Sequence, residues 1–449
     1  MNKNYLGRAA LLAVGILLCL LALSLIPEKY YDDLGMRRID LFADIKEKNT
    51  TKPKQKNKSK PKPINPKQFE IVCPTGLTCI ENLSEDSISK KQLAESIRMM
   101  RGKKKTFRIA FFGDSFVEGD MLTGDLRDTL QRVFGGAGVG YMPITSHVAG
   151  YRISITHTFS KDWLTQSIVD QPKPKAKFGI AGYVFTPAEG SWVKYSGVKK
   201  SRLNIYKRVR ILYSGADGEK ITLNKEQEIT LEKGEGVKEK TIELDSAKSI
   251  HLQFTQNGNL KLYGVILEGA DDGLLLDNYS MRGNSGIGQA EVSETIYKQS
   301  DAIIKYDLVV LQYGLNVANS KYTDYQWYKI SMNKALAHVK KSFPNCPILI
   351  ISVSDRGSKQ GTMKGIVELL KVQQTFAQKH RMLFYNLWEA MGGEGSMANF
   401  VDRKWANKDY THLTFEGGRF VAGQFAKAII HALNEIEKHD KLPRTYASN

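Results

Sequence analysis

The sequence has 449 residues, of which 42% are hydrophobic and 25% are charged, so it is long enough for two folded units and too apolar for a disordered chain. The formal net charge of +18 would suit a nucleic-acid-binding protein, but nine lysines and one acid fall between Lys46 and Lys67. The remainder contains no zinc-finger spacing, RNA-binding aromatic signature or basic recognition helix. Composition and charge therefore argue against nucleic-acid binding.

Near its start the chain carries an apolar run, "AALLAVGILLCLLALSLI", of eighteen uncharged residues. At 1.5 Å per residue, a helix of this length approaches the thickness of a bilayer core. The run ends in Leu-Ile-Pro rather than in the small residues of a cleavage site, which favours an uncleaved anchor over a secretion signal. We therefore predict a transmembrane helix at residues 9–27. Residues 1–8, with Lys3 and Arg8, would lie in the cytoplasm and the rest outside.

Residues 28–68 are predicted to be a Lys/Pro-rich linker. Their second half, "KEKNTTKPKQKNKSKPKPINPK", has four prolines and almost no apolar side chains, so it cannot bury a core and should be extended. Lysines beside a membrane can also bind anionic lipid or polymer. A solvated spacer accounts for the same composition.

The four cysteines occupy different settings. Cys19 lies in the apolar run and Cys346 precedes an apolar run typical of a strand, whereas Cys73 and Cys79 are six residues apart in "CPTGLTC". Outside the cytoplasm that spacing favours a small disulfide loop. The alternative is two independent buried thiols.

Five short apolar runs after the linker are typical of buried parallel strands. They are "RIAFFGD" at 108–114, "GLLLDNYS" at 273–280, "YDLVVLQYG" at 306–314, "CPILIISVS" at 346–354 and "RMLFYNLW" at 381–388. Helical patterns separate most of them, at 122–134, 288–300, 325–343 and 363–380, and a last helix follows Phe415. This alternation predicts an α/β fold, a three-layer α/β/α sandwich with a parallel sheet, built from residues 69–145 and 273–449.

Residues 146–272 interrupt that alternation. They are rich in Thr, Tyr, Val and Ile, and "QNGN" lies between two alternating runs, which predicts a β-hairpin. We therefore predict an inserted all-β sandwich domain. Its larger aromatic residues could form a sugar-binding platform or, at strand spacing, belong to the core: Trp163, Tyr183, Trp192 and Tyr195.

Ser115, in "GDSFVEGD", directly follows the first strand and precedes a helix, so it should stand at the carboxyl edge of the sheet, where open α/β sheets bind ligands. A serine hydroxyl is nearly inert at neutral pH and needs a base. Of eight histidines, only His412 has an aspartate, Asp409, three residues earlier. The carboxylate could hold one ring nitrogen while the other faces the serine. Alternatively, the segment is only the lead-in to the last helix.

Two other strand ends supply donors for an oxyanion. Gly283, in "NYSMRGNSG", leaves its backbone N–H unblocked, and Asn316, in "QYGLN", is an uncharged donor. Each residue alone would be an ordinary turn residue. The clustered acids Asp114, Glu118 and Asp120 raise a metal site as a rival interpretation, but no histidine or cysteine stands near them in the sequence. We therefore predict no metal and no cofactor.

The order of five residues resembles the sequence blocks of the SGNH (GDSL-type) hydrolase superfamily, over roughly 105–145 and 273–435: Ser115, Gly283, Asn316, Asp409 and His412. "GDSFVEGD", "YGLN" and the β insertion resemble bacterial peptidoglycan O-acetylesterases and related polysaccharide deacetylases, whose insertion is a carbohydrate-binding-module-like sandwich. The resemblance implies Ser115 as nucleophile, His412 as general base and Asp409 as its orienter. It also implies an oxyanion hole made by the serine N–H, the Gly283 N–H and the Asn316 side chain.

Three functions are compatible with this pattern. The first is a serine esterase, anchored in a bacterial inner membrane and facing the periplasm, that removes O-acetyl or similar acyl groups from peptidoglycan or another cell-surface glycan. The second is a glycan O-acyltransferase that uses the same serine and takes its acyl group from a membrane donor or acyltransferase partner. The third is a non-catalytic glycan-binding protein.

Overall fold

The computed structural model describes residues 73–82, 87–200, 202–255, 259–321 and 324–441, together with four isolated positions before residue 16. Apart from those positions, the predicted cytoplasmic N-terminus, membrane anchor and linker lie outside the described residues. Within the described part of the chain, no helix is both long enough and apolar enough to cross a membrane. The folded region belongs to one unit, Glu70–Asn449.

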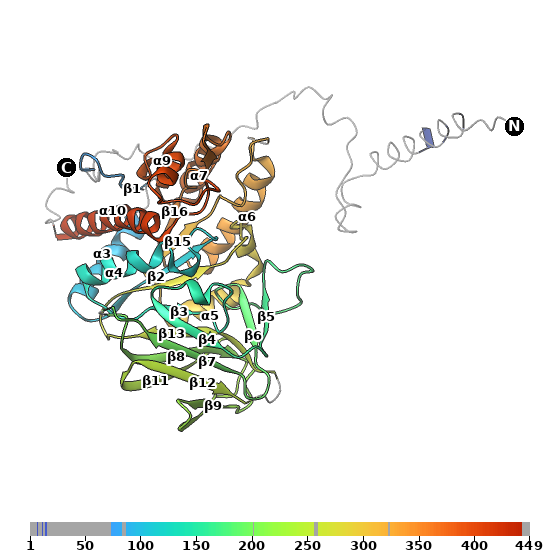
Figure 1. Ribbon diagram of the computed structural model, residues 1–449, viewed down its shortest axis with the longest axis vertical. Coiled ribbons are helices and arrows are strands. Elements are labelled where there is room, and N and C mark those ends of the chain that lie inside the picture. Colours follow the sequence, from blue (N-terminus) through green and yellow to red (C-terminus); the bar gives the residue numbers. More distant parts are fainter. Residues whose placement is uncertain are drawn as a thin grey trace, which may run out of the picture. The chain divides into compact units, whose positions relative to one another are not determined.

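The central sheet has six strands, and all of its neighbouring pairs are parallel except the pair that includes β1. Their order is β1 (Ile80–Asn82), β19 (Leu383–Tyr385), β16 (Ile348–Ile351), β15 (Leu308–Gln312), β2 (Thr106–Gly113) and β14 (Gly273–Ser280). Strand β2 therefore lies between β15 and β14, and the residues that follow it reach the carboxyl edge between the ends of these two strands (Figure 1).

Helices cover both faces of this sheet. Phe111 and Phe112 are consecutive residues of β2, and consecutive strand residues point to opposite faces. Phe111 packs edge-on against Phe425, and Phe112 packs against Tyr297. The first face carries α3 (Ser87–Arg101), α4 (Thr123–Phe134) and α10 (Phe415–Lys441), and the second carries α5 (Glu294–Ile304), α6 (Gln326–Ser342) and α7 (Ile366–His380). The result is three layers, α/β/α.

Shorter elements decorate the carboxyl edge and the loops. They are η2 (Glu118–Asp120), η3 (Ala149–Tyr151), η4 (Ile287–Glu291), α8 (Leu387–Ala390), α9 (Ser396–Asp402) and the hairpin of β17 (Gly357–Ser358) and β18 (Gly361–Thr362). The sequence pattern predicts one helix over 288–300. The structure divides this stretch into η4 and α5, with Ser293 accepting a hydrogen bond from the Ile296 N–H as the N-cap of α5.

From β3 (Gly140–Met142) to β14 the chain forms two antiparallel sheets with their own apolar core (Figure 1). One sheet has the order β10 (Gln227–Thr230), β9 (Lys220–Leu223), β12 (Ser249–Phe254), β7 (Trp192–Gly197) and β4 (Ile155–Phe159). The other has the order β11 (Lys238–Ala247), β8 (Tyr206–Ser214), β13 (Lys261–Glu268), β6 (Tyr183–Thr186) and β5 (Leu164–Ser167), and β3 (Gly140–Met142) also pairs with β13. The sandwich thus recruits a strand that precedes residue 146.

The hairpin predicted at "QNGN" is wrong. Strand β12, before this motif, pairs with β7 and β9, whereas β13, after it, pairs with β3, β6 and β8. The chain therefore crosses from one sheet to the other. Leu252 of β12 and Leu262 of β13 both face the shared core, so apolar residues on each side of the motif do not separate a hairpin from a sheet-to-sheet connection.

The four aromatic residues considered for a sugar platform separate into two groups. Tyr195 is fully buried in the sandwich, Tyr183 stacks on Phe185, and Trp163 packs edge-on against the buried Phe254. These three contribute to packing. Trp192 is partly exposed and stacks against His251 instead.

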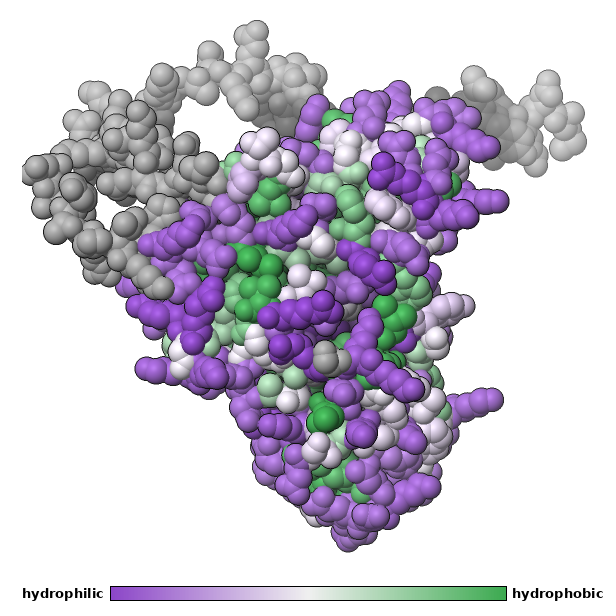
Figure 2. All heavy atoms as spheres, turned by 60° about the vertical axis from the view of Figure 1, so that its left-hand side comes forward, coloured by the Kyte–Doolittle hydropathy of each residue, from purple (hydrophilic) through white to green (hydrophobic). Residues whose placement is uncertain are grey.

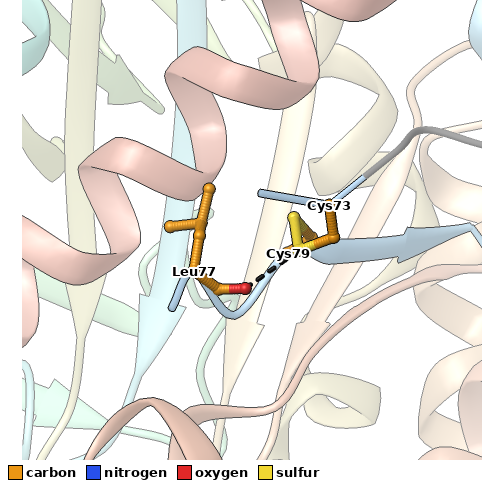
Figure 3. Close-up of a disulfide and its surroundings, with 3 residues drawn as sticks. All are labelled: Cys73, Leu77 and Cys79. Carbon is orange, nitrogen blue, oxygen red and sulfur yellow. Dashed lines mark hydrogen bonds between the residues drawn. A yellow bond between two sulfur atoms is a disulfide. The ribbon is translucent and has the colours of Figure 1, made fainter. Parts of the chain in front are cut away.

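A disulfide joins Cys73 and Cys79 immediately before β1 (Figure 3). The loop between them turns through a hydrogen bond from the Leu77 N–H to the Pro74 carbonyl, and the Cys73 sulfur lies 2.9 Å from the Leu77 carbonyl oxygen. The bridge expected from the six-residue spacing is therefore present. Cys346 is a buried free thiol.

Candidate active site

The turn after β2 presents Ser115 at the sheet edge. The buried side chain of Asp114 accepts a hydrogen bond from the Phe116 N–H at 2.9 Å. The backbone carbonyl of Asp114 accepts one from the Val117 N–H at 3.2 Å. Gly113 is needed for this tight path, because a Cβ there would lie only 2.7 Å from a methyl group of Val117. The chain therefore reverses within three residues and holds the serine between the strand and the segment that follows.

His412 and Asp409 form a hydrogen-bonded line with Ser115. The serine Oγ lies 3.3 Å from His412 Nε2, and His412 Nδ1 lies 2.7 Å from Asp409 Oδ2. The other carboxylate oxygen accepts the N–H groups of Thr411 and His412, both at 3.0 Å. Partial burial tends to raise the pKa of Asp409, but the hydrogen bonds from His412 and Thr411 outweigh it and lower this pKa. The ionised carboxylate can only accept, so Nδ1 carries the proton and Nε2 is free to accept from the serine.

Gly283 and Asn316 lie on either side of the serine turn. The last residues of β14 and β15 both pair with the last residue of β2, and these two residues follow within four positions. The Asn316 side-chain amide donates to the carbonyl of Asn284 at 3.0 Å, which ties the two loops together. Gly283 has φ of +78°, and a Cβ there would meet no other atom within 4 Å. Glycine is thus required by the backbone conformation, and the space beside it is open.

Ser115 and His412 open into a cleft of about 330 Å³. Apolar side chains form part of its wall, including Phe116, Met121 and Leu413. Such a wall lowers the local dielectric and strengthens electrostatic interactions with a reacting group. The cleft can accommodate a small acyl group next to the serine.

Charged and aromatic residues that the sequence analysis did not assign to the cleft line its rim. The Arg282 Nε donates to Glu118 at 2.9 Å, and Tyr151, from η3 at the start of the insertion, lies beside them with 70% of its surface exposed. Arg282 and Glu118 are 164 positions apart, so no local pattern indicates their pairing. The position of Arg282 directly before Gly283 is the one sequence feature that could have singled it out.

Asp120 is a buried charged residue that lies three positions before α4 begins at Thr123. Its carboxylate lies 3.3 Å from both Arg127 and Arg152 and accepts from Asn278 at 3.0 Å. Burial alone would raise the pKa of Asp120, but the two arginines outweigh it and hold this pKa far below its usual range. Since Arg152 lies between β3 and β4 of the sandwich, this junction ties the insertion to the serine turn.

The three acids near the serine face separate partners. Asp114 faces the Phe116 N–H, Glu118 faces Arg282, and Asp120 faces Arg127 and Arg152. Within the described ranges, no group of three His, Cys, Asp or Glu side chains is placed to hold a metal ion. These acids therefore do not form a ligand cluster.

Asp114 should make the stability of the protein depend on pH. Burial raises its pKa to about 7, against opposing hydrogen bonds and the nearby His412. In the unfolded chain this carboxyl loses its proton near pH 4. The folded protein therefore binds more protons between about pH 4 and pH 7, and its stability falls as the pH rises through this window. The stabilising contribution is complete only below about pH 4.

We expect Asp114→Asn to flatten this dependence. From pH 5 to pH 8 the parent should lose roughly 2–4 kcal/mol more of its free energy of unfolding than the variant loses, because each unit of pKa shift corresponds to about 1.4 kcal/mol. Urea unfolding at the two pH values measures this change. Parallel pH profiles for parent and variant would contradict the assignment.

Comparison with known proteins places this geometry on a known fold. No protein-family model and no curated protein matches the sequence. A solved peptidoglycan O-acetylesterase matches with a TM-score of 0.65 and 20% sequence identity, covering 79% of this chain and 99% of that one. An Enterococcus faecalis lipase/acylhydrolase matches with a TM-score of 0.27, 17% identity and coverage of 35% and 76%. An acetylxylan esterase from Geobacillus stearothermophilus matches with a TM-score of 0.26 and 18% identity, covering 36% of this chain and 73% of that one.

The first match extends over more of the chain than the α/β part alone could supply, so it includes both the parallel sheet and part of the sandwich. At 20% identity it shows a shared fold. The chain thus shares the fold of a solved peptidoglycan O-acetylesterase. This conclusion rests on the first match, because the TM-scores of the other two are too low to support it.

Proposed function

We propose that the protein is an SGNH-type serine ester hydrolase that removes O-acetyl groups from a cell-surface glycan. The observation that carries this proposal is the hydrogen-bonded line from Asp409 through His412 to Ser115, opening into the cleft. A serine needs both a base and an orienter for that base to act as a nucleophile at neutral pH. The three side chains supply those parts.

The reaction would proceed in two halves. His412 Nε2 takes the proton of Ser115 as its oxygen bonds to the ester carbonyl carbon, and the tetrahedral adduct then expels the sugar oxygen, which receives that proton. A water molecule next loses a proton to His412 and attacks the acetyl-serine, releasing acetate and restoring the Ser115 hydroxyl. Asp409 accepts from Nδ1 throughout and stabilises the imidazolium.

The developing oxyanion needs donors that are in place beforehand, since each can contribute about 3 kcal/mol to the rate. The backbone N–H groups of Ser115 and Gly283 and the amide of Asn316 are the candidates. In the free protein the Asn316 amide donates to Asn284, which holds it in position until a substrate oxygen competes for it. The missing Cβ of Gly283 leaves room for that oxygen.

Acylated peptidoglycan is the substrate we favour, because the matching solved structure that spans both the sheet and part of the sandwich is a peptidoglycan O-acetylesterase. The predicted anchor and linker would hold the catalytic unit outside a bacterial inner membrane. There the enzyme would reach O-acetyl groups on the wall. Its partners would be this glycan and the membrane.

Incubation with O-acetylated peptidoglycan tests the proposal. We expect acetate release, with a mass loss of one acetyl group per cleaved site. The competing acyltransferase would instead add mass to a deacetylated glycan when an acyl donor is supplied. Absence of acetate release combined with acyl gain would replace hydrolysis by transfer.

Arg282 is expected to contribute more to glycan hydrolysis than to hydrolysis of a small ester. Its Nε bonds Glu118, and no other partner is recorded for its guanidinium among the described residues, so the remaining N–H groups can meet carboxylates or hydroxyls of a large substrate. In Arg282→Ala, kcat/KM should fall about tenfold further for acetylated glycan than for 4-nitrophenyl acetate. Arg132→Ala is a matched control, because Arg132 is similarly exposed and bonds one carboxylate, Asp128, on α4. Equal losses on both substrates would contradict this role.

A further inference from the structure

The outer face of the sheet that contains β7 and β12 carries an unusual tryptophan. Along these strands, residues of one parity are buried in the sandwich core, such as Val193 and Leu252. Residues of the other parity face outward, and Trp192 is the only large aromatic side chain among them. Figure 2 shows the sandwich, in the lower part of the view, as mostly hydrophilic with small separate apolar patches. Trp192 is not packed against the sandwich core, so its indole is open to a ligand.

Trp192 lines a groove of about 680 Å³ that shares no lining residue with the serine cleft. The groove is lined by Trp192 and Lys194 of β7, by Ser249, His251 and Gln253 of β12, and by Asn224 and Lys225 after β9. The strand register places His251 opposite Lys194 and Gln253 opposite Trp192. These side chains therefore stand next to one another on a single surface.

The groove is held in a defined geometry by its own contacts. The rings of Trp192 and His251 stack, with centroids 5.5 Å apart and planes 22° from parallel. The Asn224 side-chain oxygen accepts the His251 backbone N–H at 2.9 Å, which directs the amide NH₂ away from the strand. Gln253 donates weakly to the Gly190 carbonyl at 3.4 Å and keeps its side-chain oxygen free to accept. An aromatic plate and two amides are thus in place without a ligand.

All formal charge in the lining is positive. Lys194 and Lys225 have no ion-pair or hydrogen-bond partner recorded among the described residues, in contrast to Lys220 of β9, which pairs with Glu228. Burial first, and then these two ammonium groups, lower the pKa of His251. An anionic ligand would gain favourable interactions here that no protein carboxylate already provides.

We propose that this groove binds an acidic saccharide, separately from the esterase site. A sugar ring packs its C–H face on the Trp192 indole, its hydroxyls exchange hydrogen bonds with Asn224 and Gln253, and its carboxylate lies near the two lysines. Side chains that combine an apolar plate with a few polar groups are what a polar ring ligand requires. Nucleic acid fits less well, because single-stranded binders interleave several aromatic residues along a basic track and this groove offers one.

Binding of hexagalacturonate to the folded protein carrying Ser115→Ala tests the proposal, with maltohexaose as the neutral comparison. Calorimetry should detect binding of hexagalacturonate and no binding of maltohexaose. Trp192→Ala should weaken it at least tenfold. Lys194→Ala/Lys225→Ala should weaken it similarly and reduce its dependence on salt.

Lys199→Ala/Lys207→Ala removes the same charge from exposed positions outside the groove and should bind like the parent. Thermal melting of each variant in the Ser115→Ala protein shows whether it is folded. If Trp192→Ala is unstable, Lys194→Ala/Lys225→Ala still tests the proposal. Proteins that keep Ser115 and carry the groove substitutions should hydrolyse 4-nitrophenyl acetate at the parent rate. Loss of saccharide binding can then be distinguished from loss of the proposed esterase activity. Equal affinity of parent and groove variants, absence of binding, or equal binding of a single-stranded DNA oligonucleotide would overturn the proposal.

Discussion

Replacement of Ser115 by alanine is expected to lower kcat for a small acetyl ester by roughly 10⁴- to 10⁶-fold, because residues of a nucleophile–base unit fail together when one is removed. The hydroxyl that faces His412 Nε2 at 3.3 Å is the only nucleophile in that line. KM should change little, since the serine contributes mainly to bond formation. Steady-state hydrolysis of 4-nitrophenyl acetate by protein lacking residues 1–69 measures this loss.

Ser280→Ala is the matched control. Ser280 ends β14 and pairs in register with Gly113 of β2 at the same sheet edge, but among the residues that the structure describes its hydroxyl makes no hydrogen bond to a histidine. Its loss should leave hydrolysis within about twofold of the parent. Residual activity of Ser115→Ala at the level of this control would mean that another group attacks the ester.

Replacement of Asp120 by asparagine is expected to cost about 3–5 kcal/mol of the free energy of unfolding, because it leaves two buried guanidinium groups without their counter-charge. The side chains of Arg127 and Arg152 are 1% and 4% exposed, so water cannot replace the carboxylate. The pKa of Asp120 is held low by these arginines, so its contribution is complete at neutral pH and is lost only when the pH falls through that low value. Urea unfolding at pH 7 measures the difference.

Asp128→Asn provides the comparison on the neighbouring helix. Asp128 pairs with the 70% exposed Arg132, and such surface pairs contribute less than about 1 kcal/mol. A loss for Asp120→Asn no larger than that of Asp128→Asn would show that the buried junction does not hold the insertion to the α/β unit.

Sequence patterns predict the parallel sheet well because its strands are buried on both faces. The runs that became β15 and β16 are almost wholly apolar, a pattern that few other structures explain. Helix α3 went unpredicted although Leu93, Ile97 and Met100 are buried and lie at helical spacing, because this apolar stripe covers only the second half of "SISKKQLAESIRMMR". The connection of β12 to β13 was misassigned because alternation reports which side is buried and carries no information about the pairing partner.

The site residues also divide into those that a local sequence pattern marks and those that only the fold brings together. Ser115, Asp409 and His412 could be singled out because each stands beside a local signal, a strand end or an Asp three residues before a His. The partners of Asp120 and of Glu118 could not, because Arg152, Asn278 and Arg282 lie 32 to 164 positions away and meet them only through the fold. Long-range ion pairs depend on topology, which a single sequence specifies only indirectly.

A fluorophosphonate probe tests most directly whether Ser115 is the reacting alcohol. After labelling of the folded protein and peptide mapping, we expect one modified peptide, carrying the adduct on Ser115, and a rate of labelling that falls at least a hundredfold in His412→Gln. An adduct on a different serine, or labelling of Ser115 that is as fast without the imidazole as with it, would contradict the proposed chemistry.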